Sequence, residues 1–284
     1  MQLRLAIQKS GRLSDKSIDL LHSCGIRFSH PKGRLRAVSD NFPIEVLYLR
    51  DDDIPGYVAD GVADLGIVGE NVVLEKGVQV DEVRRLGFGR CRLAIALPRG
   101  EKYDGVSSLQ GRSLATSYPR LLERFLSDNG VQASIHEISG SVEIAPGIGL
   151  SEGICDLVST GSTLLSNGLK EVETILRSEA VLVANPDLSR EKRKLLERIE
   201  FRIDSVLRSK GFRYILLNAP IAAVDHIIRL LPGMRSPTVV PLADDGWVSI
   251  HSVIQEDDFW SIVDQLKEAG AEGMLVVPIE KMVM

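Results

Sequence analysis

The sequence predicts an α/β protein with mostly parallel sheets, followed by a separate small domain. Short apolar runs of strand length alternate with segments of helical spacing, which is typical of parallel sheets covered by helices. This alternation begins again at Cys91, so we expect two α/β repeats. Beyond residue 211 the order becomes strand, helix, strand, strand, helix, strand, which is the ferredoxin-like order and predicts a third unit.

The first repeat contains three expected strands and two expected helices. The strands are short apolar runs bounded by polar residues or glycine, at 3–8, 45–50 and 64–69. One helix, 15–25, has apolar residues at helical spacing and a glycine stop. The other, 53–61, has a proline near its start and a glycine at its end.

The same signals define the elements of the rest of the chain. In the second repeat we expect a helix at 119–130 and strands at 91–98, within 108–118 and at 133–139. The stretch 149–161 has the pattern of a helix end, a glycine and a strand, and 189–211 that of a charged amphipathic helix. In the last unit the strands are expected at 212–220, 238–243, 247–254 and 273–280, and the helices at 222–233 and 257–270.

An internal similarity links the two repeats. The stretch ADGVADLGIVG (59–69) aligns with SEGICDLVSTG (151–161) at a constant offset. Four pairs of residues are identical: Gly61 and Gly153, Asp64 and Asp156, Leu65 and Leu157, Gly69 and Gly161. One interpretation is that the two repeats end in related loops that face each other across a cleft. The alternative is that the same succession of helix, glycine and strand has arisen independently in each repeat.

Composition excludes several classes of function. The chain has 284 residues, enough for two or three domains, and a net charge of −5 without a basic tract, which argues against nucleic-acid binding. We expect no membrane association and no signal peptide, because no apolar run is long enough. The three cysteines lack CxxC spacing, which indicates reduced thiols in a cytoplasmic protein.

The most informative stretch is the loop expected after the strand of 149–161. It contains Ser159, Thr160, Gly161, Ser162 and Thr163, four hydroxyls around one glycine. A strand, a small-residue loop and a helix N-terminus present backbone N–H groups to an anion, and glycine allows a close approach. The loop therefore predicts a site for a phosphate monoester. The alternative is a simple helix cap, for which one hydroxyl is enough.

Two carboxylates accompany this loop. Asp156 precedes it in the same strand, and Glu143 lies in the preceding segment SVEIAPG. Carboxylates repel phosphate but accept hydrogen bonds from ribose hydroxyls, and they hold magnesium through waters. A phosphate loop beside acids therefore indicates a ribose 5-phosphate group, unless Asp156 only stabilises a turn.

The opposite wall of the expected cleft carries basic residues at strand ends. Lys9, Arg12 and Arg50 lie where α/β sheets bind ligands, and they are suited to a polyphosphate. Glu70 stands where the twin loop has hydroxyls, which suits a neutral or amino-bearing group, and Tyr118 is placed to stack on a base. Taken singly, each of these residues is also consistent with an ordinary surface side chain.

The ordered motifs resemble the ATP phosphoribosyltransferase family. The stretch SVEIAPGIGLSEGICDLVSTGSTL resembles the signature of that family through Glu143, Gly149, Asp156, Gly161 and Thr163. The similarity runs nearly end to end and includes LAIQKSGRLS, LRDDDIPGYVADGVADLGIVGENV, CRLAIALP, LATSYPRLL, LPGMRSPTVVPL and LVVPIEKM. The C-terminal βαββαβ unit resembles the long form, which carries its own regulatory, ACT-like domain.

This resemblance implies a fold and a reaction. The catalytic part would consist of two lobes similar to type II periplasmic binding proteins, lobe I at 1–90 plus 180–204 and lobe II at 91–179, with a regulatory domain at 205–284. The enzyme would use Mg2+ to condense ATP with 5-phosphoribosyl 1-pyrophosphate, giving N1-(5-phosphoribosyl)-ATP and pyrophosphate in the first step of histidine biosynthesis. L-histidine would inhibit it, and the homo-oligomer would shift between dimer and hexamer.

The resemblance also assigns roles to residues of this chain. The 159–163 loop would hold the 5-phosphate, and Asp156, with Glu143 as a helper, would address the ribose or the metal. The three basic residues would face the polyphosphates, with Glu70 and Tyr118 near the nucleotide. The histidine pocket would include Asn218, Met234, Ser236, Thr238 and Gly273. Many relatives have an acid at the position of Asn218, so the strength of inhibition stays open.

Two rival functions remain at this point. One is a cytosolic two-lobed sensor that binds a small ligand without turnover. The other is a phosphoribosyltransferase with a different base as acceptor, because only the resemblance favours ATP.

Overall fold

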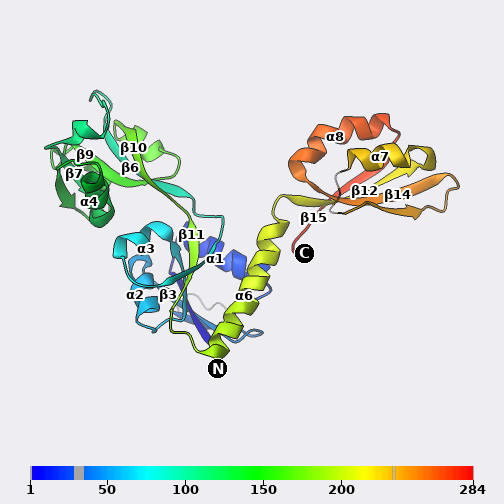
Figure 1. Ribbon diagram of the computed structural model, residues 1–284, viewed down its shortest axis with the longest axis horizontal. Coiled ribbons are helices and arrows are strands. Elements are labelled where there is room, and N and C mark those ends of the chain that lie inside the picture. The colour runs from blue at the N-terminus through cyan, green and yellow to red at the C-terminus, as the bar shows by residue number, and fades with distance from the viewer. Residues whose placement is uncertain (1, 29–34, 232, 234, 284) are drawn as a thin grey trace. The chain divides into compact units, whose positions relative to one another are not determined.

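The computed structural model describes residues 2–28, 35–231, 233 and 235–283. The chain divides into two compact units, residues 1–198 and 199–284, each described by itself below. The boundary falls within a long helix, α6 (Arg190–Ser209). Figure 1 shows the elements coloured along the chain.

The first unit contains two mixed sheets. The six-stranded sheet has the order β2-β3-β1-β4-β11-β5. Its strands are β1 (Leu3–Gln8), β2 (Arg36–Val38), β3 (Ile44–Leu49), β4 (Leu65–Gly69), β5 (Asp81–Arg85) and β11 (Ala180–Ala184). Its helices are α1 (Arg12–Ser23), α2 (Ile54–Ala59), α3 (Glu70–Lys76) and the 3-10 helix η1 (Asp51–Asp53).

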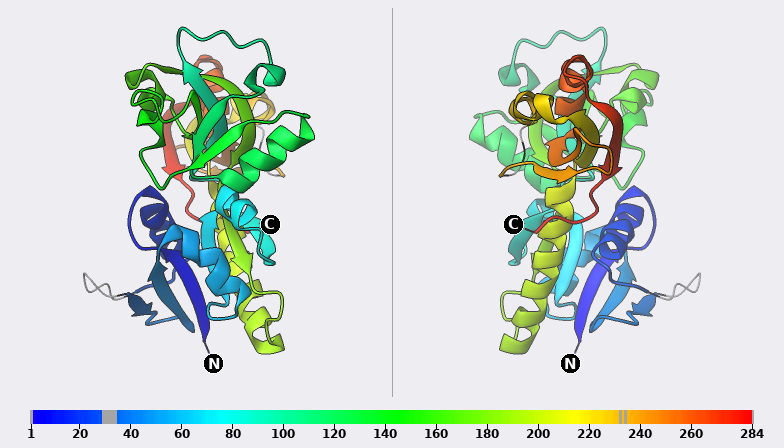
Figure 2. Two further views of the ribbon diagram at one scale, coloured as in Figure 1. Left: turned by 90° about the vertical axis from the view of Figure 1, so that its left-hand side faces the viewer. Right: turned by 90° about the vertical axis from the view of Figure 1, so that its right-hand side faces the viewer.

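The five-stranded sheet has the order β10-β6-β9-β7-β8. Its strands are β6 (Cys91–Pro98), β7 (Ser113–Thr116), β8 (Ser134–Glu137), β9 (Gly153–Val158) and β10 (Leu169–Ser178). The helices beside it are η2 (Val106–Leu109), α4 (Pro119–Asp128), η3 (Val142–Ile144) and α5 (Ser162–Ser166). Two connections join the sheets, from β5 into β6 and from β10 into β11, and both can be followed in Figure 2.

The prediction of mostly parallel sheets is wrong. In the first sheet only β1 pairs in parallel, with β3 and β4, while β2, β11 and β5 join antiparallel. In the second sheet β7 is parallel to β8 and β9, but β6 is antiparallel to β9 and β10. The reason is that the chain leaves the first sheet through β6 and returns through β10 and β11, and these connecting strands run against their neighbours.

The expected helix end before β9 is also wrong. The chain there forms the short 3-10 helix η3 and a series of turns, and β9 begins directly at Gly153. This stretch, SVEIAPGIGLSEG, contains Pro146 and three glycines after η3, which cannot sustain an α-helix. The other expected strands and helices of the unit are present, with ends that differ by a few residues.

Each sheet of the first unit has its own apolar core. One core packs α2 and α3 against β4 and β11 through Ile54, Val58, Val68 and Val183. Another packs α4 against β6 and β7 through Leu93, Leu114 and Leu122. On the other face of the second sheet, η3 and α5 pack against β6 and β9. These cores hold the carboxyl ends of β1, β3, β4 and β9 in place, where the predicted site residues lie.

The second unit is a four-stranded sheet with two helices. Strands β12 (Phe212–Pro220), β13 (Thr238–Pro241), β14 (Trp247–Gln255) and β15 (Glu272–Pro278) lie in the order β13-β14-β12-β15, all antiparallel. Helices α7 (Val224–Leu230) and α8 (Glu256–Glu268) cover one face of this sheet, as Figure 1 shows. Ile215, Ile250 and Leu266 are buried in the core between them. The predicted ferredoxin-like order is confirmed.

Candidate active site

The hydroxyl loop lies at the carboxyl end of β9, as predicted. Gly161 adopts a left-handed conformation, with φ of 82°, and caps helix α5, which begins at Ser162. All four hydroxyl-bearing residues of the loop are exposed, and the hydroxyls of Thr160 and Ser162 lie 3.0 Å apart. A residue with a side chain at position 161 would be strained, so glycine is what permits this compact turn. The loop therefore presents four small donors on one exposed turn.

Asp156 and Glu143 lie close enough to influence each other. Asp156 is on β9, and its Oδ1 accepts a hydrogen bond of 2.8 Å from the backbone N–H of Leu157. Burial raises the pKa of the Asp156 carboxyl, and the charge of Glu143 raises this pKa further. The structure thus brings the two predicted acids together from β9 and η3, although 13 positions separate them in the sequence.

The twin positions of the internal similarity serve different purposes. Asp64 is buried, pairs with Nζ of Lys192 at 2.6 Å and accepts a hydrogen bond from the N–H of Arg4. Asp156 has no such cationic partner among the described residues. In both repeats a helix begins directly after the matched glycine, since α3 starts at Glu70 and α5 at Ser162. Related strand-to-helix junctions are therefore present, with a structural acid in one and an unpaired acid in the other.

Two of the predicted basic residues meet at one edge of the first sheet. Lys9 follows β1 and Arg50 follows β3, and these strands are parallel neighbours. The backbone N–H of Lys9 donates to the carbonyl of Leu49 over 2.8 Å, so Lys9 and Arg50 are adjacent. Arg12 is the first residue of α1. All three side chains are exposed, and none forms an ion pair with a described residue.

Asp51 is a site residue that the sequence analysis did not single out. It follows Arg50 at the start of η1, and its Oδ1 is buried without a hydrogen-bond partner among the described residues. Burial raises the pKa of Asp51 to about 6, and the neighbouring charge of Asp52 contributes. The only sequence signal is the run of three aspartates, which does not reveal which one is buried.

Replacing Asp51 by asparagine is expected to stabilise the protein at pH 7. The pKa is raised on folding, so the carboxyl favours the folded state below about pH 4, and this contribution is lost as the pH rises through about 6. Asp51→Asn should therefore raise the free energy of unfolding by about 3 kcal/mol at pH 7, with a smaller gain as the pH falls toward 4. Urea unfolding at several pH values measures this, with exposed Asp53→Asn as the control. A gain that does not change with pH would contradict it.

Glu70 is only partly available to a ligand. One of its oxygens forms an ion pair with the guanidinium of Arg85 on β5, whereas Oε2 is buried and has no partner among the described residues. The side chain is 12% exposed. Glu70 therefore stays a predicted ligand residue, with one oxygen engaged by the protein itself.

Tyr118 is held by a hydrogen-bond network that begins on α3. Its hydroxyl accepts a hydrogen bond of 3.0 Å from Nδ2 of Asn71, which is buried. The Oδ1 of Asn71 accepts from the hydroxyl of Ser178 over 2.8 Å, and its N–H donates back to that hydroxyl. Burial raises the pKa of Tyr118, and the nearby charge of Asp156 adds to this, so the phenol stays protonated.

Asn71 and Ser178 were missed by the sequence analysis because 107 residues separate them.

A second set of long-range hydrogen bonds joins α3 to α4. The carboxylate of Glu75 accepts hydrogen bonds of 2.9 Å from the backbone N–H groups of Arg120 and Leu121 at the start of α4. Nη1 of Arg120 donates in return to the carbonyl of Lys76 over 3.1 Å. An acid at a helix N-terminus and a cation at a helix C-terminus are both favourable.

Of the residues predicted to form the histidine pocket, Asn218, Thr238 and Gly273 lie on strands of the same sheet. Asn218 on β12 lies opposite Ser249 of β14, and a Cβ placed on Gly273 would come within 3.3 Å of Nδ2 of Asn218. Thr238, on the edge strand β13, lies opposite His251, two positions from Ser249. Ser236 is exposed just before β13, whereas Met234 lies outside the described residues.

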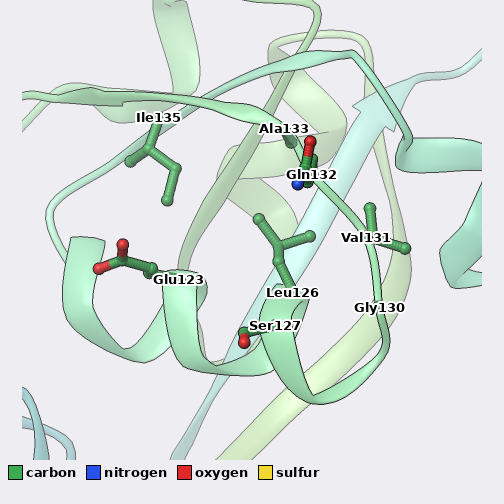
Figure 3. A pocket seen from close by; sticks show the side chains of 8 residues that line it. All are labelled: Glu123, Leu126, Ser127, Gly130, Val131, Gln132, Ala133 and Ile135. Carbon is green, nitrogen blue, oxygen red and sulfur yellow. The ribbon is translucent and has the colours of Figure 1, made fainter.

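A separate surface pocket lies away from all of these residues. It has a volume of about 410 Å³ and lies between the second half of α4 and the edge strand β8 (Figure 3). Its lining residues are Glu123, Leu126, Ser127, Gly130, Val131, Gln132, Ala133 and Ile135. None of the predicted site residues lines it, and Glu123 is its single ionisable side chain.

Two further kinds of feature are absent from the described part of the chain. No group of three or more histidine, cysteine, aspartate or glutamate side chains is arranged to hold a metal ion there. Nor does that part contain a helix with the length and apolar character needed to span a membrane. The three cysteines are not joined in disulfides, and Cys24 and Cys155 are buried.

Comparison with protein families gives two matches that together cover most of the chain. Residues 50–205 match the family model described as "ATP phosphoribosyltransferase". Residues 209–281 match the model described as "HisG, C-terminal domain". The first match covers more than half of the chain and includes all predicted residues of the first unit except Lys9 and Arg12.

Curated relatives match over almost the whole length. An ATP phosphoribosyltransferase of Cytophaga hutchinsonii is 60% identical over 281 residues, 99% of this chain and 98% of the relative. That of Parabacteroides distasonis is 54% identical over 282 residues, 99% of this chain and all of the relative.

Solved structures resemble about seven-tenths of this chain. The ATP phosphoribosyl transferase (HisG:HisZ) complex from Thermotoga maritima contains a chain with a TM-score of 0.62 and 31% identity, matching 71% of this chain and 98% of that one. The substrate binding protein of an amino acid ABC transporter has a TM-score of 0.50 at 10% identity, over 74% of this chain and 94% of that one. The latter is a likeness of fold alone, and it agrees with the predicted periplasmic-binding-protein-like architecture.

Proposed function

Because this chain belongs to the ATP phosphoribosyltransferase family, we propose that its loop at 159–163 holds the 5-phosphate of 5-phosphoribosyl 1-pyrophosphate. The chain is a pentosyltransferase that carries out the first step of histidine biosynthesis, in which ATP and 5-phosphoribosyl 1-pyrophosphate give N1-(5-phosphoribosyl)-ATP and pyrophosphate. The sensor without turnover is not favoured, since binding proteins resemble this chain in fold alone. We further assign lobe I to 1–90 plus 180–204, lobe II to 91–179 and the regulatory domain to 205–284.

The observation that carries the phosphate assignment is the exposed loop itself. Gly161 in its left-handed conformation lets Thr160 and Ser162 approach each other, and four hydroxyls surround the same turn. Backbone N–H groups and hydroxyls bind a phosphate monoester without a cation in the loop. Asp156 and Glu143 then lie beside the sugar, where carboxylates accept hydrogen bonds from the ribose hydroxyls.

The same two acids fit a magnesium ion. Phosphoribosyltransferases are in general metal-dependent, and Mg2+ binds through one or two carboxylates together with substrate phosphates. Asp156 is desolvated and close to a second carboxylate, a condition that a divalent cation relieves. Asp156 and Glu143 would hold the ion, which would supply positive charge for the departing pyrophosphate.

ATP is assigned to the edge of the first sheet. Lys9 and Arg50 are adjacent and exposed there, and Arg12 is exposed at the start of α1, three residues after Lys9, so their charges are available to the triphosphate. Tyr118 offers its ring to adenine, held in place by Asn71. Adenine N1 has a free lone pair at neutral pH, so its attack on the anomeric carbon needs no general base. The bond from that carbon to N1 forms as the bond to pyrophosphate breaks, with inversion and with alignment as the main source of catalysis.

A single assay tests this function. The protein is incubated with ATP, 5-phosphoribosyl 1-pyrophosphate, magnesium and a pyrophosphatase, and the nucleotides are separated. Formation of phosphoribosyl-ATP is the expected result. A product formed only with another base would support a different phosphoribosyltransferase, and tight binding without any product would support the sensor.

Inhibition by L-histidine is assigned to the second unit. The supporting observation is that Asn218 and Gly273 are neighbours on β12 and β15, with Thr238 nearby on the same sheet. Gly273 has a φ of 58°, which a residue with a side chain adopts only with strain. Because glycine occupies this position, no side chain fills the space beside Asn218.

Replacing Asn218 by aspartate is expected to strengthen histidine inhibition. A carboxylate forms a charge-assisted pair with the ammonium group of the amino acid, whereas an amide oxygen only accepts a hydrogen bond. The histidine concentration for half inhibition should fall about tenfold. The exposed change Asn129→Asp alters the net charge equally and serves as the control. An unchanged or weaker inhibition by Asn218→Asp would place the effector elsewhere.

Assembly and location complete the proposal. We expect a homo-oligomer that shifts between dimer and hexamer in the cytoplasm. The matched Thermotoga maritima structure is a complex of two kinds of chain, and its matched chain corresponds to 71% of this one. This chain carries a C-terminal domain of its own at 209–281, which supports self-assembly without a separate regulatory chain.

A further inference from the structure

The loop at 159–163 contains no lysine or arginine, yet a guanidinium group contacts its first residue. Arg92, the second residue of β6, donates from Nη1 to the backbone carbonyl of Ser159 over 3.1 Å. The two residues are 67 positions apart and meet because β6 and β9 are antiparallel neighbours, with Arg92 opposite Val158.

Arg92 is itself fixed by a second residue. Its Nε donates to Oε1 of Glu171 on β10 over 2.7 Å, and its Nη2 donates to Oε2 of the same carboxylate. The hydroxyl of Thr174 donates to Oε1 as well, over 3.0 Å. The side chains of Arg92 and Glu171 are 27% and 25% exposed, so water competes only partly for this pair. A bidentate pair of this kind holds the guanidinium plane in one orientation.

The orientation of that plane has a consequence for the loop. The carbonyl of Ser159 and the N–H of Thr160 belong to one planar trans peptide, so they point in opposite directions. Holding the carbonyl against Arg92 therefore directs the N–H of Thr160 away from the guanidinium. The hydrogen bond also keeps the partially negative carbonyl oxygen of Ser159 turned toward a cation. If this peptide rotated freely, the carbonyl oxygen would face a bound anion and repel it.

From this geometry we propose that Arg92, clamped by Glu171, is a positioning residue for the phosphate loop. It sets the orientation of the peptide between Ser159 and Thr160. The inference rests on the proposed binding of the 5-phosphate by residues 159–163. Arginine is required because three of its donors act at once, two on Glu171 and one on Ser159, and the single ammonium of lysine cannot reproduce this fork.

The test is Arg92→Lys in the full-length protein, which keeps the charge and removes the fork. We expect the KM for 5-phosphoribosyl 1-pyrophosphate to rise about tenfold, the effect of one lost charge-assisted hydrogen bond, with the KM for ATP unchanged within about twofold. Arg112→Lys is the matched control. Arg112 also donates to a backbone carbonyl, that of Ser108, and also pairs with a glutamate, Glu101, but it does not contact the loop.

A parallel variant separates this inference from the proposed function. Thr163→Ala removes a loop hydroxyl and should raise the same KM. If Thr163→Ala raises it and Arg92→Lys does not, the positioning role is overturned and the phosphate loop stands. If Thr163→Ala has no effect, the phosphate assignment fails and the inference fails with it. An equal rise in both KM values for Arg92→Lys would mean general damage to the unit and would also overturn the inference.

A second variant covers the case in which Arg92→Lys does not fold cooperatively in thermal unfolding. Glu171→Gln keeps Arg92 and weakens its clamp, so a rise of about threefold in the KM for 5-phosphoribosyl 1-pyrophosphate is expected, again without an effect on ATP. An unchanged KM in this variant would overturn the role of the clamp.

Discussion

Replacing Ser162 and Thr163 together by alanine is expected to raise the KM for 5-phosphoribosyl 1-pyrophosphate about 100-fold and to leave ATP binding nearly intact. Each hydroxyl donates to a charged phosphate oxygen, and such a bond contributes about 1.5–3 kcal/mol, so the loss of two weakens binding by two or more factors of ten. Both side chains are exposed, and Gly161 keeps the turn, so the fold should not change. Steady-state kinetics with each substrate varied in turn measures the effect.

The control for this experiment lies in the same short helix. The hydroxyl of Ser166 donates to the carbonyl of Ser162 over 2.8 Å, one turn beyond the loop, and Ser166→Ala should leave both KM values unchanged. An equal loss of affinity for ATP and for the sugar substrate in the double variant would contradict the assignment of the loop to the phosphate.

The second large effect is expected at Asp156. Asp156→Asn should lower kcat about 100-fold to 1000-fold, because a carboxylate beside the sugar stabilises the positive charge that develops at the anomeric carbon. The same change should stabilise the fold at neutral pH, since burial raises the pKa of Asp156 and ionisation therefore costs stability. Rapid-quench kinetics and thermal unfolding of one preparation measure both quantities.

The twin residue Asp64 provides the matched control for that prediction. Asp64→Asn breaks a buried ion pair with Lys192, so it should lower the unfolding temperature and leave kcat per folded molecule unchanged. The two aspartates occupy equivalent positions in the internal similarity, yet opposite effects on stability are expected. A loss of stability in Asp156→Asn with full activity would contradict the proposed role of Asp156.

The pH dependence of the reaction follows from the same carboxyl. The raised pKa of Asp156 means that the group becomes protonated at a higher pH than an ordinary aspartate. A proton therefore competes with magnesium for this carboxylate at a higher pH than at an ordinary aspartate. The magnesium concentration needed for half-maximal activity should rise as the pH falls, and this rise should be absent from the residual activity of Asp156→Asn.

Local features of the fold and of the site were predictable from the sequence. Strands such as β1 and β9 are short apolar runs, and the hydroxyl loop is contiguous, so its chemistry can be read within a few residues. The internal similarity predicted related junctions after the two matched strands, and in the structure a helix starts directly after both Gly69 and Gly161. Strand direction was wrong because antiparallel pairing of β6 with β9 and β10 depends on long connections, which periodicity does not report.

Most of the residues that the sequence analysis missed act across long separations. Asn71 meets Ser178, Arg92 meets Ser159, and Glu75 caps a helix that begins more than 40 residues later. None of them has an unusual neighbour in the sequence, so no local signal marks them. The burial of Asp51 is a further example, since three identical aspartates in a row differ only in what packs around them.

The most direct test of the account is the position of the sugar substrate in a crystal. Crystals soaked with 5-phosphoribosyl 1-pyrophosphate and magnesium are expected to show the 5-phosphate within hydrogen-bond distance of residues 159–163, with Asp156 beside the ribose. A 5-phosphate bound instead at Lys9 and Arg50, or at any place away from this loop, would contradict the central claim.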